Sequence, residues 1–226
     1  MKKVTNTIST ITLLVAILIS NQSFSQMKME AAKNTSMTSS AVMLKSTMRK
    51  LWEDHITWTR NVILCLVDEL PGKDQAVKRL LRNQDDIGNA IKPYYGEEAG
   101  KKLTELLHIH INISADVVTS AKEGKAKELD EANKKWDENA DEISEFLHKA
   151  NPNWTLAEMK MMMKDHLKLT TEEAVQRIKK DYDADVVAYD NVHNEILKMA
   201  DMLSDGIVKQ FPEKFNMSMG KKLAAE

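Results

Sequence analysis

The feature that most constrains the fold is a helical spacing of apolar residues that runs almost unbroken from residue 41 to residue 211. Apolar side chains recur in alternating steps of three and four positions, as the inward face of an amphipathic helix requires. The 226 residues include only seven glycines and four prolines, so few points interrupt this pattern. Strand signals would need alternation in steps of two, bounded by frequent turn residues. We therefore expect an all-α fold.

Proline, glycine and capping signals divide this region into segments. Thr155 with Glu158, and Thr170 with Glu173, each match a capping box, in which a hydroxyl and a carboxylate bond to the free amides of a helix start. The expected helices are 41–69, 73–91, 97–122, 125–149, 155–168 and 171–211. The prediction is an up-down helical bundle of four long helices with two short connecting helices, 73–91 and 155–168. We find no internal repeat in the sequence.

The two ends of the chain differ from the bundle domain at 41–211. Lys2 and Lys3, an apolar segment from Ile8 to Ile19, and small residues before Gln26 have the layout of a secretory signal peptide at 1–25. Residues 26–40 are expected to be a flexible leader, and residues 212–226, which follow a helix-stopping proline, a C-terminal tail. The mature protein is then periplasmic or secreted, with no membrane anchor after cleavage of the signal.

Charge and cysteine content exclude some functions. Cleavage after residue 25 removes Lys2 and Lys3 and no acids, which changes the formal net charge from −2 to −4. Because no basic face or arginine-rich run is present, no nucleic-acid partner is expected. Cys65 is the only cysteine, so no intramolecular disulfide can form.

Histidine recurs on the inward stripes of the expected helices. His55, His110, His166 and His193 each occupy a stripe position, whereas the stripe of 125–149 has Trp136 instead. His55 and His110 lie at the middle of their helices and His193 lies near the middle of 171–211. Long antiparallel helices align their middles, so these three could meet in one layer. His166 fits less well, because it lies at the end of its expected helix.

Imidazoles that meet in an apolar interior favour a metal site. They cannot all be protonated cheaply, and each neutral ring leaves an acceptor nitrogen that needs a partner. A divalent ion such as zinc, iron or copper satisfies that need, with His55, His110 and His193 as ligands and Asp190 or His166 as a further ligand. The alternative is a structural hydrogen-bond network of His, Tyr and Asp that fixes the helix register.

Three sequence blocks resemble an uncharacterised family of small bacterial all-helical proteins. They are "LWEDHITWTR", "WDENADEISEFLHKANPNW" and "DYDADVVAYDNVHNEILKMADMLSDGIVKQFPEKF", and the resemblance covers about residues 48–215. Some members carry glycosyltransferase or acetylglutamate kinase labels, but this sequence has no glycine-rich phosphate loop and no doubly wound β/α pattern. The resemblance implies the same helix boundaries and inward histidines, and it implies no activity.

Two functions are therefore compatible with the sequence. The first is an exported soluble helical bundle that binds a metal ion or small cofactor through inward histidines. The second is a non-catalytic interaction or scaffold protein whose histidines are structural. Whether the protein is an enzyme stays open, although no nucleophile elbow or comparable catalytic motif is present.

Overall fold

The computed structural model describes residues 38–215, and within that range the chain forms helices and no strands. The helices are α2 (Ser39–Asp68), α3 (Lys73–Tyr95), α4 (Glu97–Glu123), α5 (Ala126–Ala150), α6 (Leu156–Lys179), α7 (Tyr182–Gln210) and α8 (Pro212–Phe215). The predicted all-α helical bundle is confirmed. The expected signal peptide at 1–25 and most of the expected leader lie outside the described residues.

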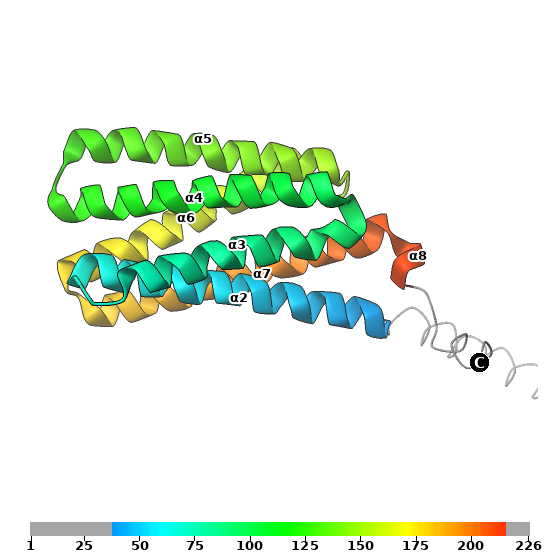
Figure 1. Cartoon of the computed structure of the whole chain (residues 1–226), viewed down its shortest axis with the longest axis horizontal. Helices are drawn as coiled ribbons and strands as arrows, with labels where there is room; N and C mark the ends of the chain where they lie inside the picture. The colour runs from blue at the N-terminus through cyan, green and yellow to red at the C-terminus, as the bar shows by residue number, and fades with distance from the viewer. Residues whose placement is uncertain (1–37, 216–226) are drawn as a thin grey trace, which may run out of the picture. The chain divides into compact units, whose positions relative to one another are not determined.

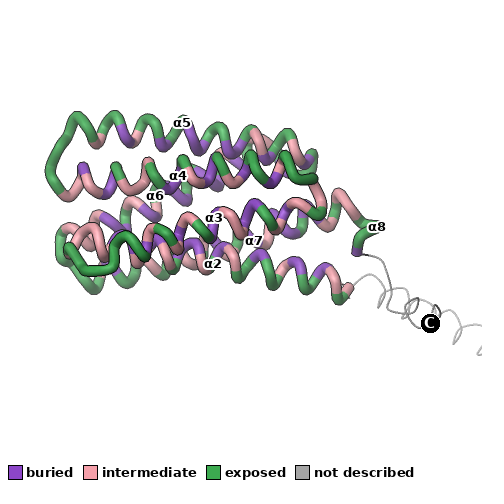
Figure 2. The backbone as a smooth tube through the Cα atoms, in the orientation of Figure 1, coloured by how far each residue is buried: buried purple, intermediate pink, exposed green. Residues whose placement is uncertain are grey.

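The six long helices run alongside one another (Figure 1), and their contacts join them into a closed ring of antiparallel neighbours. Each helix packs against the next one along the chain, and α7 packs back against α2. In addition, α2, α4 and α6 contact one another across the ring, so these three are the inner helices of the bundle. Buried and exposed residues alternate along each helix with the periodicity of an amphipathic helix (Figure 2).

The helices expected to be short connectors are as long as the others. α3 has 23 residues and α6 has 24, against 25 to 30 for the remaining long helices. Pro93 lies in the last turn of α3 without ending it. The bundle therefore consists of three similar hairpins, α2–α3, α4–α5 and α6–α7, rather than four long helices with two connectors.

The expected helix start at Thr170 is wrong. α6 continues through Thr170 and Glu173, and both side chains are buried in the bundle. The break falls instead at Lys180, which ends α6 in the left-handed conformation with φ of 61°, and at Asp181, which caps α7 through Ala184 N–H. The capping box at Thr155 and Glu158 is confirmed, because both of its reciprocal hydrogen bonds are present.

The chain remains packed beyond residue 211. Residues 212–215, assigned to the tail from the sequence, form α8, and Phe215 is buried against the ring of Tyr94 at a centroid distance of 5.7 Å. Ser40 Oγ, at the start of α2, donates a hydrogen bond to Phe215 O at 3.2 Å. None of the helices formed by residues 38–215 combines the length and the apolar character that crossing a membrane requires.

A repeat that the sequence does not display is present in the structure. His55, His110 and His166 are 55 and 56 positions apart, each on the first helix of a hairpin. The left-handed residues Glu69, Gly124 and Lys180, which follow those first helices, have the same spacing. The expectation of no internal repeat is therefore corrected. The three hairpins share a register although few of their equivalent residues are identical.

Candidate functional site: a buried histidine layer

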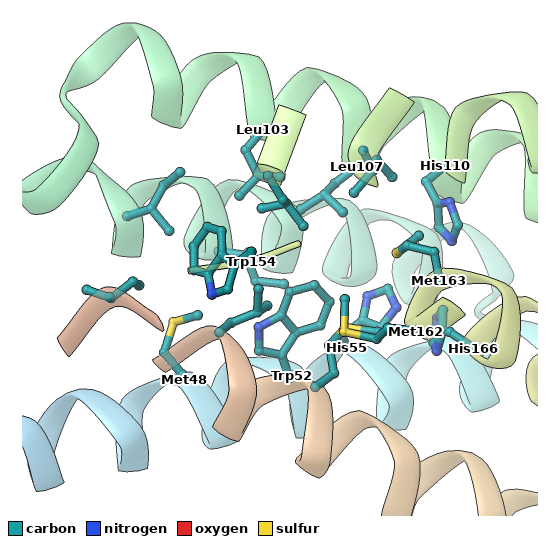
Figure 3. A pocket seen from close by; sticks show the side chains of 17 residues that line it. Met48, Trp52, His55, Leu103, Leu107, His110, Trp154, Met162, Met163 and His166 are labelled. Carbon is teal, nitrogen blue, oxygen red and sulfur yellow. The ribbon is translucent and has the colours of Figure 1, made fainter. Parts of the chain in front are cut away.

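Three histidines from the inner helices meet in the centre of the bundle (Figure 3). His55 comes from α2, His110 from α4 and His166 from α6, and they are 2%, 2% and 4% exposed. The ring centroid of His166 lies 5.6 Å from that of His55 and 6.1 Å from that of His110. His166 is therefore the central ring of the layer. It reaches the middle of the bundle because α6 extends to Lys179 instead of ending near residue 168.

The structure places His193 and Asp190 elsewhere. His193 was expected on the buried stripe of α7, but its side chain is 29% exposed and its Nε2 lies 3.1 Å from Glu53 Oε1. The buried stripe of α7 passes through Val192 and Ile196 instead. Asp190 is exposed. The reason is the break at Lys180, since a stripe counted continuously from residue 171 across that break is out of phase with the first half of α7.

Each layer histidine is held through Nδ1 by a side chain from the second helix of its own hairpin. His55 Nδ1 lies 3.3 Å from Gln84 Nε2, His110 Nδ1 lies 2.9 Å from Asn139 Oδ1, and His166 Nδ1 lies 3.1 Å from Glu195 Oε2. The two partners are 29 positions apart in all three pairs. None of these partners was predicted from the sequence, and their constant spacing from the histidines is the signal that could have identified them.

The partners fix the protons of the rings. Asn139 Nδ2 donates to Leu106 O at 3.2 Å, so its oxygen faces His110 and accepts from Nδ1–H. His110 Nε2 in turn accepts a hydrogen bond from Trp136 Nε1 at 3.2 Å. His110 therefore has a partner at both nitrogens as a neutral imidazole. Trp136, which stands on the stripe of α5 where the other stripes have histidine, thus contacts the same layer through its N–H.

Burial keeps two of the layer histidines, His55 and His110, neutral. Loss of solvation, together with the nearby His166, lowers the pKa of His110 to about 3. Burial, and then the neighbouring His166 and His110, also lowers the pKa of His55 well below its ordinary value. At physiological pH these two imidazoles are uncharged, which is the form that binds metal ions.

A small cavity adjoins the histidines on the side of α8. Its volume is about 20 Å³, enough for one water molecule or one ion. The three histidines line it together with apolar side chains, among them Trp52, Leu107 and Met163, which occupy equivalent positions three residues before each histidine. Among residues 38–215, no three His, Cys, Asp or Glu side chains are arranged closely enough to hold a metal ion as they now lie.

The third hairpin adds a buried ionic network that the other hairpins lack. Glu173 and Asp185 are each 1% exposed, and Arg60 bonds to Glu173 at 2.7 Å and to both oxygens of Asp185 at 2.9 and 3.0 Å. Arg177 bonds to Asp185 and to Asp68, which extends the network to the surface. Paired in this way, buried carboxylates are tolerated because each keeps a charged donor.

Comparison of the chain with protein-family models, with characterised proteins and with solved structures finds no match. The resemblance to a family of bacterial helical proteins therefore stays a prediction. The class that fold and site define is an all-α bundle with a buried trihistidine layer at its centre.

Proposed function

We propose that the protein is a metal-binding protein that holds one divalent first-row ion at the layer formed by His55, His110 and His166. The observation that carries the proposal is the convergence of three buried histidines, from three helices, on a cavity of about 20 Å³. Imidazole suits zinc, iron and copper. His193 and Asp190 are no longer among the proposed ligands, because His166 takes the place that the sequence assigned to His193.

Ring spacing and anchoring support this proposal. An ion about 2.0–2.1 Å from three Nε2 atoms in tetrahedral geometry places the ring centroids about 5 Å apart. The two distances from His166 are 5.6 and 6.1 Å, which exceed this spacing by about half an ångström to one ångström. Glu195 and Asn139 accept from Nδ1–H, which is the support that metal-ligating histidines ordinarily have and which leaves Nε2 for the ion.

Ion binding requires two local changes. Trp136 N–H has to leave His110 Nε2, and His55 has to carry its proton on Nδ1. Gln84 Oε1 is buried without a hydrogen-bond partner. Turning the Gln84 amide would let this oxygen accept from His55 Nδ1–H, at the loss of the bonds from Gln84 Nε2 to Leu80 O and to Asn83 Oδ1.

The size of the cavity argues against an organic cofactor. Binding pockets for drug-sized molecules and cofactors are about 300–1,000 Å³. The space at the histidines is far smaller, and the three inner helices contact one another around it. A single ion therefore fits the layer better than the small cofactor that the sequence left open.

Elemental analysis and matched histidine variants test the proposal. Protein purified from its native compartment is expected to contain close to one metal ion per chain, and added metal should raise the melting temperature. His55→Ala and His166→Ala should lose the ion, whereas His193→Ala, at the surface, should retain it. Metal that binds equally well to all three variants, or absence of stoichiometric metal from the parent, would contradict the proposal.

Trp136→Phe gives a second test of the same site. Phenylalanine keeps an aromatic ring in the core but removes the N–H that competes for His110 Nε2. The variant is expected to bind metal more tightly than the parent, by a few-fold to about tenfold for the loss of one buried hydrogen bond. Unchanged or weaker binding would show that His110 is not a ligand.

A second candidate function is a scaffold whose histidine layer is purely structural. The observation in its favour is that both nitrogens of His110 already have partners. It predicts no metal in the native protein and a loss of roughly 1–3 kcal/mol on replacing His110, because Asn139 and Trp136 are then left unpaired. The elemental analysis separates it from the metal-binding proposal.

We also propose that the protein acts outside the cytoplasm, on the basis of the sequence of residues 1–25 alone. N-terminal sequencing of the mature protein should begin at Gln26 or within a few residues of it. Recovery of the chain with Met1 intact from the cytosol would contradict export.

A further inference from the structure

A second cavity lies on the side of the histidine layer that faces the three hairpin turns. Its volume is about 90 Å³, and all three hairpins contribute to its wall. Thr59, Ser114 and Thr170, each four residues after a layer histidine, form a ring of hydroxyl groups along it. None of the described side chains that line this cavity is charged. It is distinct from the metal site proposed above.

Thr170 differs from its two counterparts. Thr59 Oγ1 donates to His55 O and Ser114 Oγ donates to Ile111 O, both at 2.8 Å, so these hydroxyls are satisfied by their own helices. Thr170 is 4% exposed, lines the cavity, and its Oγ1 is buried without a hydrogen-bond partner. Buried polar groups are nearly always paired, so an unpaired hydroxyl on a residue that lines a cavity marks a position for a hydrogen-bond acceptor.

On the side of α5 and α6, residues of the cavity wall also reach the surface. Asn133 on α5 lines the cavity and also lines a surface groove that runs along α5 and α6. Lys134, Asp141 and Lys160 lie on the groove side. Leu129, Asn133, Val175 and Ile178 at the cavity wall are only partly buried. Because these side chains border both the cavity and solvent, we expect a small molecule to enter past them without separation of the inner helices.

We propose that this cavity is a binding site for a small neutral molecule with one hydrogen-bond acceptor, which takes the hydroxyl proton of Thr170. The ligand is neutral because an unpaired charge in this wall would be strongly disfavoured. It is small because an apolar cavity of about 150 Å³ is filled by benzene, so the 90 Å³ here corresponds to roughly three to five non-hydrogen atoms. Short ketones, aldehydes and ethers have this chemistry.

Acetone and xenon are the probes for the test, because acetone carries a carbonyl acceptor and xenon has none. Methyl resonances of Val117, Val118 and Ala174, which line the cavity, report binding to the full chain in solution. Thr170→Val removes the hydroxyl at nearly constant shape. Thr59→Val is the matched control, since Thr59 already bonds to its own helix.

The parent is expected to show saturable shifts with both probes. Thr170→Val should weaken acetone binding about fivefold, as loss of one hydrogen bond implies, and leave xenon binding unchanged. Thr59→Val should bind both probes like the parent. Equal affinity of Thr170→Val and the parent for acetone, or shifts in the parent that never saturate, would overturn the proposal. A failure of the metal proposal leaves these readouts unaffected, because no metal takes part in them.

Discussion

Glu173 occupies a position at which the first two hairpins carry valine, Val62 and Val117. Its carboxyl group is 1% exposed, and loss of solvation raises its pKa to about 7 even though Arg60 donates a hydrogen bond to it. Asp185 also faces it through Arg60, and His166 lies two turns earlier on α6. The single polar replacement thus places a titratable group inside the bundle.

Stability is expected to fall as pH rises from about 5 to 7. The pKa of Glu173 is higher in the folded chain than its ordinary value of 4.5, so within this window the folded state binds a proton that the unfolded state has lost. The contribution is fully present below the ordinary pKa and declines by at most about 1.4 kcal/mol per pH unit toward the folded pKa. Denaturant unfolding of Glu173→Gln should show less decline than the parent.

Glu172→Gln is the control for this prediction. Glu172 is the adjacent residue and is exposed, so its replacement should leave the pH profile of the unfolding free energy as it is in the parent. If Glu173→Gln and the parent lose stability equally between pH 5 and 7, the carboxyl group of Glu173 does not titrate in that range.

The sequence predicted part of the site. Three of the four inward histidines were identified correctly, because a histidine on an apolar stripe is visible from spacing alone. His193 was misplaced and His166 undervalued, since both depend on where α6 ends. Gln84, Asn139 and Glu195 could not be assigned from the stripes, because polar residues on a stripe edge look the same whether they contact solvent or a buried ring.

At the scale of the element, α6 shows how tertiary burial overrides a local signal. A Thr and a Glu three residues apart match a capping box, but the pattern carries no information on which face is buried. At residues 170 and 173 both side chains point inward, and the apolar contacts of Leu167 and Ala174 continue the helix. The end of α6 at Lys180 could not be predicted from a glycine or a proline, because neither residue is present there.

Lys180→Gly is expected to raise the free energy of unfolding. Lys180 has φ of 61°, a conformation that glycine adopts without the steric cost of a side chain, and Gly124 already fills the equivalent position in the second hairpin. A gain of about 0.5–1 kcal/mol should appear in urea unfolding. Lys179→Gly, one residue earlier and helical, should be destabilising instead. Loss of stability in Lys180→Gly would contradict the left-handed assignment.

Gly88→Ala tests the close approach of α3 and α4. A Cβ at this position would lie 2.6 Å from Gly100 O and would also collide with Thr104 Oγ1, so the helices have to separate. We expect a loss of roughly 1–3 kcal/mol, typical of overpacking. Asn89→Ala, on the exposed face of the same helix, should change stability by less than about 0.5 kcal/mol. Thermal unfolding of both variants separates the effect of the α3–α4 contact on stability from the effect of alanine on helix propensity.

At the scale of the whole molecule, fold class followed from the sequence but symmetry did not. Sparse glycine and proline with helical spacing were enough to predict an all-α bundle. The threefold repeat of hairpins was not predicted, because equivalent positions carry different residue types. Gln84, Asn139 and Glu195, for example, each contact Nδ1 of a layer histidine, although one is a glutamine, one an asparagine and one a glutamate. Each buried imidazole needs a polar partner for Nδ1, and glutamine, asparagine or glutamate can each be that partner.

The hydrogen bond between Ser40 and Phe215 shows that the first and last described turns of the bundle lie together. A short peptide linker could therefore join these two ends, and the chain could be reopened at Asn153, in the turn between α5 and α6. Such a circular permutant is expected to keep the helical circular dichroism of the parent, because every hairpin stays intact. Reopening within α6 should instead abolish cooperative unfolding. Cooperative unfolding of this permutant would show that the fold does not depend on the order of the three hairpins along the chain.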